Sequence, residues 1–487
     1  RFLSGFLGLV FDPLSGELLQ NPDSNAIFSI RQLTLLYGKI ELPCSDARNL
    51  SAINQYLECE YEIHARTILC KDQVLERGAD LARIARKTIG DVFSQVDLVV
   101  YSGTVTPKHG PGSTADRVLG NQKYMQTVWP ERLERVFPFL DNALPNSRYH
   151  GYLDQVDFIE PGAEVPVKVT LVPKTLKTPR IIAQEPVAMQ YMQQAVAREL
   201  MEAIESDDLI RHFIGFTDQE PNRLMAQKGS IDGSLTTIDL SEASDRVSNL
   251  LVETVFSSWP HLNEALQATR STRAEVPGKG VISLSKFSSM GSALCFPVEA
   301  VIFFLAVLDG IQQVSNSPVT RKTLLGLKGK VRIFGDDIIV PTEYAGAVIS
   351  SLESFGFRVN DSKTFYNGNF RESCGKEYFR GTDVSITKVR RLFPTSRRSQ
   401  AEIISTVDLS NQLHKAGLWR SADLCATHVR GINVPLPCVG TRSPGLGLHS
   451  FTGVDPSKTK ECKHLHKPLI KAWTFTPRYH RNEIDDV

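Results

Sequence analysis

The sequence lacks several features that mark particular classes of protein. Its 487 residues carry a formal net charge of only +1, so the chain has no overall basic excess of the kind common in nucleic-acid-binding proteins. Any contact with nucleic acid is therefore expected to come from locally basic surfaces. The eight cysteines are scattered and form no CxxC pair, which disfavours a disulfide scaffold and favours a reducing, cytoplasmic setting.

The sequence also lacks a long uninterrupted apolar run. The longest candidate, ALCFPVEAVIFFLAVL at residues 293–308, is interrupted by Pro297 and Glu299 and falls short of the roughly 18 apolar residues that cross a membrane. We expect it to form a buried helix with Pro297 in its first turn, and we expect no membrane association. The apolar start, residues 1–13, has neither a basic region nor a clear cleavage site, which disfavours a signal peptide.

What the sequence does contain is a succession of strand and helix patterns. Residues 163–186 alternate apolar and polar side chains around prolines, which predicts strand, turn and strand, and residues 187–204 have helical spacing. An apolar strand is expected to run into a helix at Asp239, and residues 343–357 predict an amphipathic helix. These patterns indicate an α/β or α+β core, and a change to more Arg, His and Pro near residue 385 predicts a domain boundary.

Two adjacent aspartates interrupt the apolar stretch KVRIFGDDIIVP, residues 330–341. Asp336 and Asp337 are expected at the tip of a hairpin whose stem is buried, and a rigid carboxylate pair suits a hard divalent cation such as Mg²⁺ or Mn²⁺. Asp239 supplies a further carboxylate at a strand end. Two such acidic sites can hold two metal ions that stabilise the attacking and leaving oxygens of an in-line phosphoryl displacement. A solvated turn and a helix N-cap are the alternative interpretations.

A basic segment accompanies these carboxylates. The stretch VKVTLVPKTLKTPR, residues 167–180, contains four cationic side chains, which are Lys168, Lys174, Lys177 and Arg180. Such charges can neutralise the phosphates of a nucleoside triphosphate, although a solvated basic surface is the alternative. Further basic residues at 388–398 and 458–481, the latter interleaved with aromatic side chains, suit single-stranded RNA but also a solvated tail.

Taken in order, these stretches resemble the motif series of a viral RNA-dependent RNA polymerase. The basic fingers motif is resembled by the stretch VPKTLKTPRIIAQEP of this chain. The first palm motif is resembled by TTIDLSEASDRVS, which has two aspartates six residues apart. The second, third and fourth palm motifs resemble KFSSMGSALCFPVEAVIFF, RIFGDDIIVP and FGFRVNDSKTF. The hairpin that closes the palm resembles FRESCGKEYFRGTDV. Together with IDLSEASDRVS, this last stretch is similar to the replicase catalytic (beta) subunit of the single-stranded RNA bacteriophages, the leviviruses.

The resemblance implies an α+β fold of the right-hand polymerase type, with fingers, palm and thumb. The palm is then an antiparallel sheet packed on helices. The expected regions are 1–160 (an N-terminal region contributing to the fingers and bridging to the thumb), 161–235 (fingers with the basic motif), 236–385 (palm, with a fingers insertion at about 255–285) and 386–487 (thumb and C-terminal region).

The resemblance also implies roles in template-directed nucleotidyl transfer. The expected catalytic residues are Asp239, Asp336, Asp337 and Lys363. The three aspartates would be ligands of two Mg²⁺ ions, which Mn²⁺ can replace. The lysine would be a general acid. Asp245 would accept a hydrogen bond from the ribose 2′-OH. The residues expected to help position the sugar are Ser289, Gly291 and Ser292. The residues expected to bind the triphosphate are Lys174, Lys177, Arg180 and, less directly, Lys168.

The implied partners are an RNA template and product, nucleoside triphosphates, host elongation factors Tu and Ts and a ribosomal protein, in the cytoplasm of a host bacterium. A reverse transcriptase is one alternative, but SEASD at residues 241–245 is small and acidic where that class carries a bulky aromatic residue that excludes the 2′-OH. The other alternative is a non-catalytic RNA-binding protein on a polymerase fold. The presence of all three aspartates and the basic segment argues against it.

Overall fold

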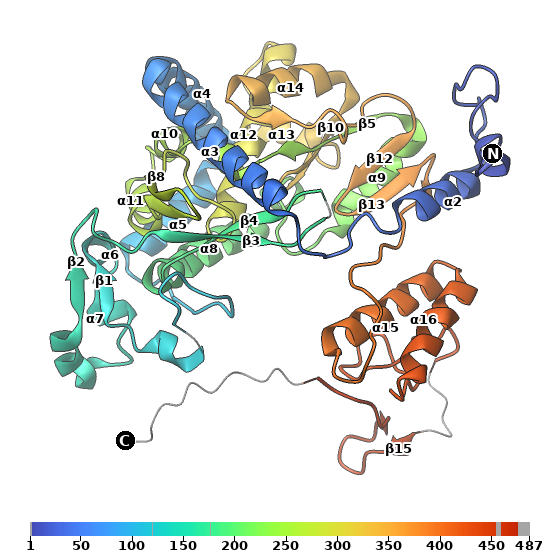
Figure 1. Ribbon diagram of the computed structural model, residues 1–487. Helices are drawn as coiled ribbons and strands as arrows, with labels where there is room; N and C mark the ends of the chain where they lie inside the picture. Colours follow the sequence, from blue (N-terminus) through green and yellow to red (C-terminus); the bar gives the residue numbers. More distant parts are fainter. Residues whose placement is uncertain (1, 119, 176, 454–458, 476–487) are drawn as a thin grey trace. The chain divides into compact units, whose positions relative to one another are not determined.

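The computed structural model describes residues 2–118, 120–175, 177–453 and 459–475 of the chain. The chain divides into two compact units. The central unit comprises Ser45–Val172 and Pro179–Ser385, and the terminal unit comprises Arg1–Cys44, Pro173–Thr178 and Ile386–Val487. Both units contain helices and strands, so the fold is a mixed one, and the aspartates discussed above lie in the central unit (Figure 1).

The sheet that carries these aspartates has three antiparallel strands in the order β5-β10-β9. The strands are β5 (Leu235–Ile238), β10 (Asp337–Pro341) and β9 (Arg332–Phe334). All of β5 is buried, because Ile238 packs into the main core while Leu235 packs into a separate cluster with Tyr378. The predicted hairpin is confirmed, since β9 and β10 pair directly on either side of Gly335 and Asp336.

Helix α12 (Cys295–Ser315) is the expected buried apolar helix, with Pro297 in its first turn. By length and composition it is the one helix among the described residues that could cross a membrane, but 89% of its 18-residue apolar stretch is buried inside the protein. Gly310 allows α12 to approach α14 (Ala345–Ser354) closely, because a Cβ there would lie 2.7 Å from the Cα of Val348. Helix α12 is therefore a core helix of the central unit.

A second sheet of the central unit has four strands in the order β4-β3-β7-β8. These strands are β3 (Val167–Val172), β4 (Arg180–Gln184), β7 (Arg273–Val276) and β8 (Gly280–Ser283). The first two pair antiparallel and confirm the strand, turn and strand predicted for residues 163–186. Helix α3 (Asp46–Leu69) runs across this sheet in Figure 1 and buries Ile53, Tyr56 and Leu57 against it.

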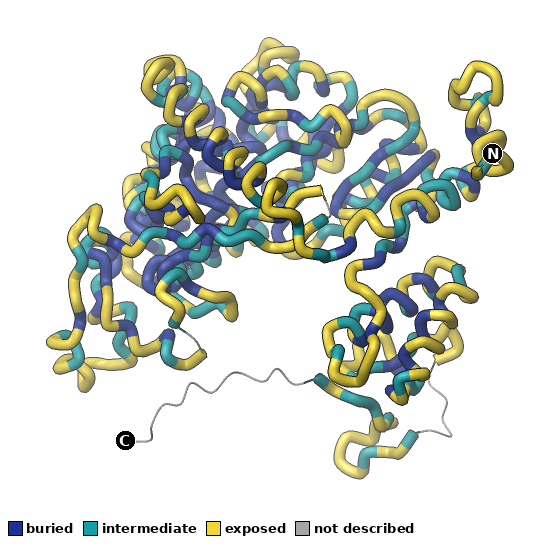
Figure 2. Tube along the Cα trace, in the orientation of Figure 1, coloured by how far each residue is buried: buried dark blue, intermediate teal, exposed yellow. Residues whose placement is uncertain are grey.

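Other helices of the central unit enclose one large apolar core. They are α4 (Lys71–Thr88), α5 (Gly90–Tyr101), α8 (Val187–Ser206), α10 (Asn249–Val255) and α11 (Pro260–Thr269). Helix α8 confirms the helix predicted for residues 187–204, and α14 confirms the one predicted for residues 343–357. Figure 2 shows buried residues along the inner sides of these elements and exposed residues along their outer sides.

The predicted passage from strand into helix at Asp239 is wrong. Strand β5 ends at Ile238, and the chain continues as β6 (Leu240–Ser241), which pairs with β11 (Arg358–Val359). A short 3-10 turn, Ser244–Arg246, follows, and α10 begins only at Asn249. Pairing with a strand more than a hundred residues away decides this path, so Asp239 lies between two strands and caps no helix.

The terminal unit contains the packed helices α15 (Gln400–Lys415) and α16 (Trp419–Gly431). Their buried residues form a cluster with Ile40 and Val389 from other parts of the unit. Helix α2 (Ser24–Leu35) is joined to the following segment through two hydrogen bonds. The side-chain amide of Gln32 donates to the carbonyl of Thr387 at 2.8 Å and accepts from its N–H at 2.9 Å. The division into fingers, palm and thumb stays a prediction.

Candidate active site

Asp239 and Asp337 are neighbours because two strands pair in a fixed register. Ile238, the last residue of β5, lies opposite Ile338 of β10. Continued by one residue beyond the paired positions, the same antiparallel register brings Asp239 level with Asp337, and Asp336 belongs to the adjoining turn. The strand register therefore brings the three predicted aspartates to one end of the sheet.

The turn between β9 and β10 rests on the first turn of α12. Gly335 has a φ of +60°, and a Cβ there would overlap the ring of Phe296, so the turn requires glycine. The ring of Phe334 packs edge-on against Phe296, with centroids 5.3 Å apart. Glu299 is buried nearby, and burial together with the charge of Asp336 raises its pKa well above the usual value. The acidic turn is thus backed by two aromatic rings and a buried carboxyl group.

The carboxylate of Asp239 is held from the segment that follows β11. Its Oδ2 accepts a hydrogen bond from the side-chain amide of Asn360 at 2.8 Å, and its Oδ1 lies 3.3 Å from Nζ of Lys363. Burial lowers the pKa of Lys363, but the carboxylates of Asp239 and Glu372 outweigh burial and raise it. Lys363 therefore lies at the acidic site in its charged form.

Asp337 is held by the hairpin of β12 (Phe370–Ser373) and β13 (Lys376–Phe379). Its Oδ1 accepts hydrogen bonds from the backbone N–H of Cys374 at 3.2 Å and from the hydroxyl of Ser373 at 3.3 Å. Burial, reinforced by the charge of Asp336, raises the pKa of Asp337 to about 6. The side chain is thus placed where a negative charge is costly in the absence of a cation.

These side chains fit a hard divalent cation in their chemistry. Carboxylate oxygens are the ligands that Mg²⁺ prefers, and crowding of like charges, as at Asp337, is relieved by a bound cation. Within the described part of the chain, no three His, Cys, Asp or Glu side chains already form a group that could hold an ion. The carboxylate of Asp239 is engaged by Lys363 and Asn360. An ion bound between the aspartates would compete with Lys363 for the carboxylate of Asp239.

Asp245, the predicted sugar-reading residue, has a partner that the sequence does not reveal. Its Oδ1 lies 3.0 Å from Nζ of Lys286, whose side chain is completely buried. The side chain of Asp245 itself keeps 20% of its surface exposed. A single lysine before a serine-rich loop carries no sequence signal that separates it from a surface lysine.

The loop before α12 contains the other residues predicted to position a sugar. The hydroxyl of Ser289 lies 2.9 Å from that of Tyr56 on α3. Gly291 has a φ of +132°, and a Cβ there would overlap a carbonyl oxygen of β4, so the loop is pressed against the second sheet. Ser292 differs, because its hydroxyl donates to the buried Oε1 of Gln193 at 3.1 Å. Ser292 therefore contributes to packing at the start of α12.

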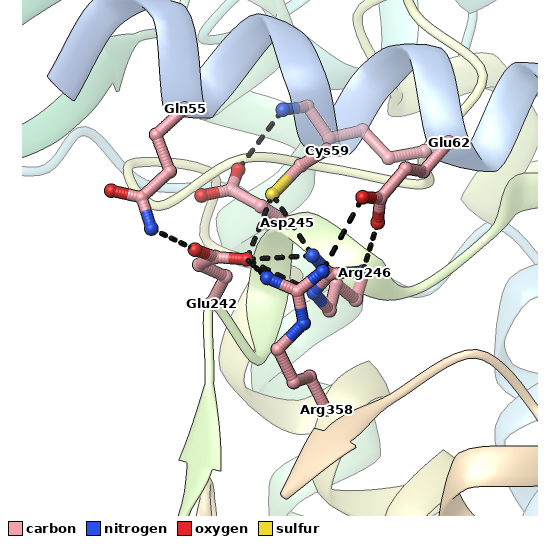
Figure 3. A network of polar contacts seen from close by, with 8 residues as sticks. Gln55, Cys59, Glu62, Glu242, Asp245, Arg246 and Arg358 are labelled. Atoms are coloured by element: carbon pink, nitrogen blue, oxygen red, sulfur yellow. Dashed lines mark hydrogen bonds and ion pairs between the residues drawn. The ribbon is translucent and has the colours of Figure 1, made fainter. Parts of the chain in front are cut away.

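An ion-pair network centred on the buried Arg246 ties the turn that carries Asp245 to helix α3 (Figure 3). Arg246 is only 5% exposed and lies 2.7 Å from Oε2 of Glu62 and 2.8 Å from Oε2 of Glu242. Arg358, which is half exposed, lies 3.3 Å from Oε1 of Glu62. The network fixes residues 242–246 against α3, and no pattern in the sequence marks its members.

The basic residues predicted to bind the triphosphate fall in both units. In the central unit, Lys168 is partly buried on β3, and Arg180 is exposed at the start of β4. Lys174 and Lys177 belong to the terminal unit. Their role in triphosphate binding stays a prediction. Part of the basic segment at 458–481, including Lys458, Arg478 and Arg481, lies outside the described residues.

Comparisons with known proteins agree with these motifs. A family model described as RNA replicase, beta-chain, matches residues 163–399. The chain is 37% identical over 266 residues to the RNA-directed RNA polymerase beta chain of Enterobacteria phage fr. The aligned region covers 54% of this chain and 45% of that protein. It is 38% identical over 223 residues to the beta chain of Escherichia phage MS2, covering 46% and 37% of the two proteins. The matches thus span less than half the length of these relatives.

Solved structures give a weaker comparison. A structure described as "RdRp complex" aligns with a TM-score of 0.43 and 14% sequence identity, covering 72% of this chain and 33% of that chain. A structure of BmCPV RNA-dependent RNA polymerase at elongation state aligns with a TM-score of 0.40 and 13% identity, covering 72% and 33% of the two chains. Similarities this low add nothing to the assignment of the site.

Proposed function

Because residues 163–399 of this chain match the family model of the RNA replicase beta chain, we propose that the protein is the catalytic subunit of an RNA-directed RNA polymerase. Its template is the positive-strand RNA genome of a bacteriophage and the complementary strand. The observation that carries the proposal is the juxtaposition of Asp239 and Asp337 at one end of the β5-β10-β9 sheet, with Asp336 in the adjoining turn.

The three aspartates hold the metal ions in this proposal. Two Mg²⁺ ions, which Mn²⁺ can replace, would lower the pKa of the primer 3′-hydroxyl and neutralise the departing pyrophosphate. Asp239 and Asp336 are the principal ligands, and Asp337 is a ligand or a partner of a ligand. The support for Asp337 is its pKa of about 6, which reflects burial and the neighbouring charge that a cation would offset.

Lys363 acts as the general acid of the reaction. Its raised pKa keeps a proton on Nζ, and that atom lies beside Asp239, where the triphosphate would be held. Donation of this proton to the pyrophosphate oxygen would assist its departure. The negative charge of the phosphates is neutralised by Lys174, Lys177 and Arg180, with a smaller contribution from Lys168.

Asp245 reads the ribose in the proposed reaction. A carboxylate accepts a hydrogen bond from a 2′-OH, which deoxyribonucleotides lack. Ser289 and Gly291 shape the neighbouring loop, and Ser292 acts through its packing at the start of α12. This arrangement favours a ribonucleotide polymerase over a reverse transcriptase.

The proposed architecture is a right hand in which residues 236–385 form most of the palm, residues 161–235 belong to the fingers and residues 386–487 to the thumb. The protein acts in the cytoplasm of the infected bacterium. The family resemblance supports host elongation factors Tu and Ts and a ribosomal protein as partners.

The test is RNA-templated incorporation of labelled ribonucleotides by the purified chain in the presence of Mg²⁺. Asp336→Asn is expected to reduce synthesis by about a thousandfold or more while leaving RNA binding intact, because it removes a ligand charge and little volume. Asp208→Asn is the matched control, since Asp208 is 95% exposed and far in sequence from the site. Unchanged Mg²⁺-dependent synthesis by Asp336→Asn would refute the metal assignment.

The same assay separates the alternatives. Reactions are run with and without bacterial lysate, so that missing host partners do not conceal activity. A reverse transcriptase would prefer deoxyribonucleotides on the RNA template. A non-catalytic RNA-binding protein would bind RNA but make no product with either set of nucleotides, with or without lysate.

A further inference from the structure

Lys286 is a charged residue in a completely enclosed place. Its side chain has 0% exposure, and its Nζ contacts three groups. It lies 3.0 Å from Oδ1 of Asp245, 3.7 Å from Oε2 of Glu60 and 3.5 Å from the centre of the Tyr56 ring. Two anions and an aromatic face thus surround one ammonium group.

Burial of this charge needs an explanation beyond stability. Burial by itself lowers the pKa of Lys286, but the electrostatic interactions with Asp245, Tyr56 and Glu60 outweigh burial and raise the pKa. Buried ion pairs often contribute little net stability compared with apolar side chains of similar volume. What such a pair does supply is a fixed orientation for both partners. Here one partner, Asp245, remains 20% exposed and can still meet a ligand.

The backbone that carries Lys286 is anchored on both sides. The guanidinium of Arg270 donates hydrogen bonds to the carbonyl oxygens of Leu284, Lys286 and Phe287, at 3.1, 2.9 and 3.2 Å. The N–H of Phe287 donates to the carbonyl of Val247 at 2.7 Å, two residues after Asp245. The lysine and the turn that bears Asp245 are therefore fixed to each other through main-chain contacts as well.

Helix α3 completes the enclosure from outside the segment that matches the replicase family. The Tyr56 ring covers the ammonium of Lys286, and its hydroxyl lies 2.9 Å from that of Ser289. Glu60, on the same helix, accepts a hydrogen bond from the N–H of Ser285. One helix thus contacts the lysine, the loop at Ser289 and the backbone just before the lysine.

We propose that Lys286 is a positioning residue for ribose selection. Its ammonium holds one oxygen of Asp245, so that the carboxylate faces the incoming nucleotide in the orientation that accepts a hydrogen bond from the 2′-OH. Tyr56 and Glu60 fix the ammonium, which makes α3 part of the apparatus that distinguishes ribonucleotides from deoxyribonucleotides. The inference rests on the proposed polymerase function.

The test compares kcat/KM for a ribonucleoside triphosphate with that for its 2′-deoxy analogue on one RNA template. Lys286→Met keeps the length of the side chain and removes its charge. We expect the ratio to fall at least about tenfold, mainly through slower ribonucleotide incorporation, because an orienting hydrogen bond to a charged group is lost. Lys279→Met, on the exposed turn between β7 and β8, is the matched control and should leave the ratio unchanged.

A double-mutant cycle shows whether Lys286 acts through Asp245. Asp245→Asn alone and Asp245→Asn combined with Lys286→Met should give the same ratio, because the lysine has nothing left to orient. A merely structural role predicts instead that the double variant loses activity toward both nucleotides and that the ratio in Lys286→Met stays that of the wild type. Either that unchanged ratio or additive losses in the cycle would overturn the proposal.

Tyr56→Leu provides the test if Lys286→Met does not fold. It removes the aromatic face and the hydroxyl but keeps both charges of the ion pair. A severalfold fall in the ratio supports the proposal, and a wild-type ratio overturns it. These outcomes differ from failure of the proposed function, in which the wild-type chain itself would make no RNA with bacterial lysate present.

Discussion

The Oδ1 atom of Asp239 lies 3.3 Å from Nζ of Lys363, although the two residues are 124 positions apart in the sequence. The contact exists because Thr237 of β5 forms an isolated bridge with Phe365, which brings the segment after β11 alongside the strand that ends before Asp239. A proposed metal ligand and a proposed proton donor are thereby adjacent.

Lys363→Met is expected to lower kcat for nucleotide addition by about a hundredfold or more, because a positioned general acid contributes on that order. The affinity for RNA should change little. Rapid-quench measurement of single-nucleotide addition gives kcat and KM separately. Lys322→Met, an exposed lysine of the same unit, is the control, and equal rates for the two variants would contradict the role of Lys363.

Gly291→Ala is expected to reduce the free energy of unfolding by more than about 2 kcal/mol. Its φ of +132° disfavours any Cβ, and the added carbon would overlap the backbone of β4. Gly326→Ala is a matched control, because Gly326 lies within α13 (Arg321–Leu327) with open space around it. That change should stabilise the helix by about 0.5–1 kcal/mol. Urea unfolding of both variants measures the contrast, and equal midpoints would contradict it.

Arg246→Met is expected to cost about 3–5 kcal/mol of unfolding free energy, because it leaves Glu242 with a poorly compensated charge in a nearly closed environment. Arg358→Met removes a cation from the same network but from its exposed side, and should cost less than about 1 kcal/mol. Thermal denaturation of the two variants under identical conditions tests the difference. Similar losses would mean that burial does not govern the network.

Glu185→Gln is expected to stabilise the protein in a pH-dependent manner. Burial raises the pKa of Glu185 to about 7, above its ordinary value of 4.5. Between these pH values the unfolded chain has lost the proton while the folded chain retains it, so stability falls as the pH rises, and the full cost is reached above pH 7. The gain in melting temperature of Glu185→Gln over the wild type should therefore be larger at pH 8 than at pH 5. A gain that is equal at both pH values would exclude the titration of Glu185 as its cause.

The sequence alone was a good guide to the elements that carry the aspartates. The hairpin at Asp336 and Asp337, the strands around residues 163–186 and the buried helix after Gly291 were all predicted, because each depends on local apolar patterns and turn chemistry. The path after Asp239 was predicted wrongly. Its pairing partner, β11, lies far along the chain, and local spacing contains no information about it.

Residues that act by being buried were missed for a related reason. Lys286 and Arg246 resemble ordinary surface cations in the sequence, and nothing beside them indicates that α3 covers them. Only the packing of α3 against the second sheet and the turn at residues 242–246 makes their charges interior ones.

The sequence by itself determined the chemistry that is available, namely carboxylates at a strand end and at a hairpin tip, a basic segment and a glycine-dependent loop. These follow from residue type and from spacing over a few positions, which act locally. The tertiary structure decided which charges face each other and which are removed from water, as with Asp239 and Lys363 or Asp245 and Lys286. Such contacts depend on strand register and on the helix that covers them, and therefore on interactions between residues that are 41 positions apart in one pair and 124 in the other.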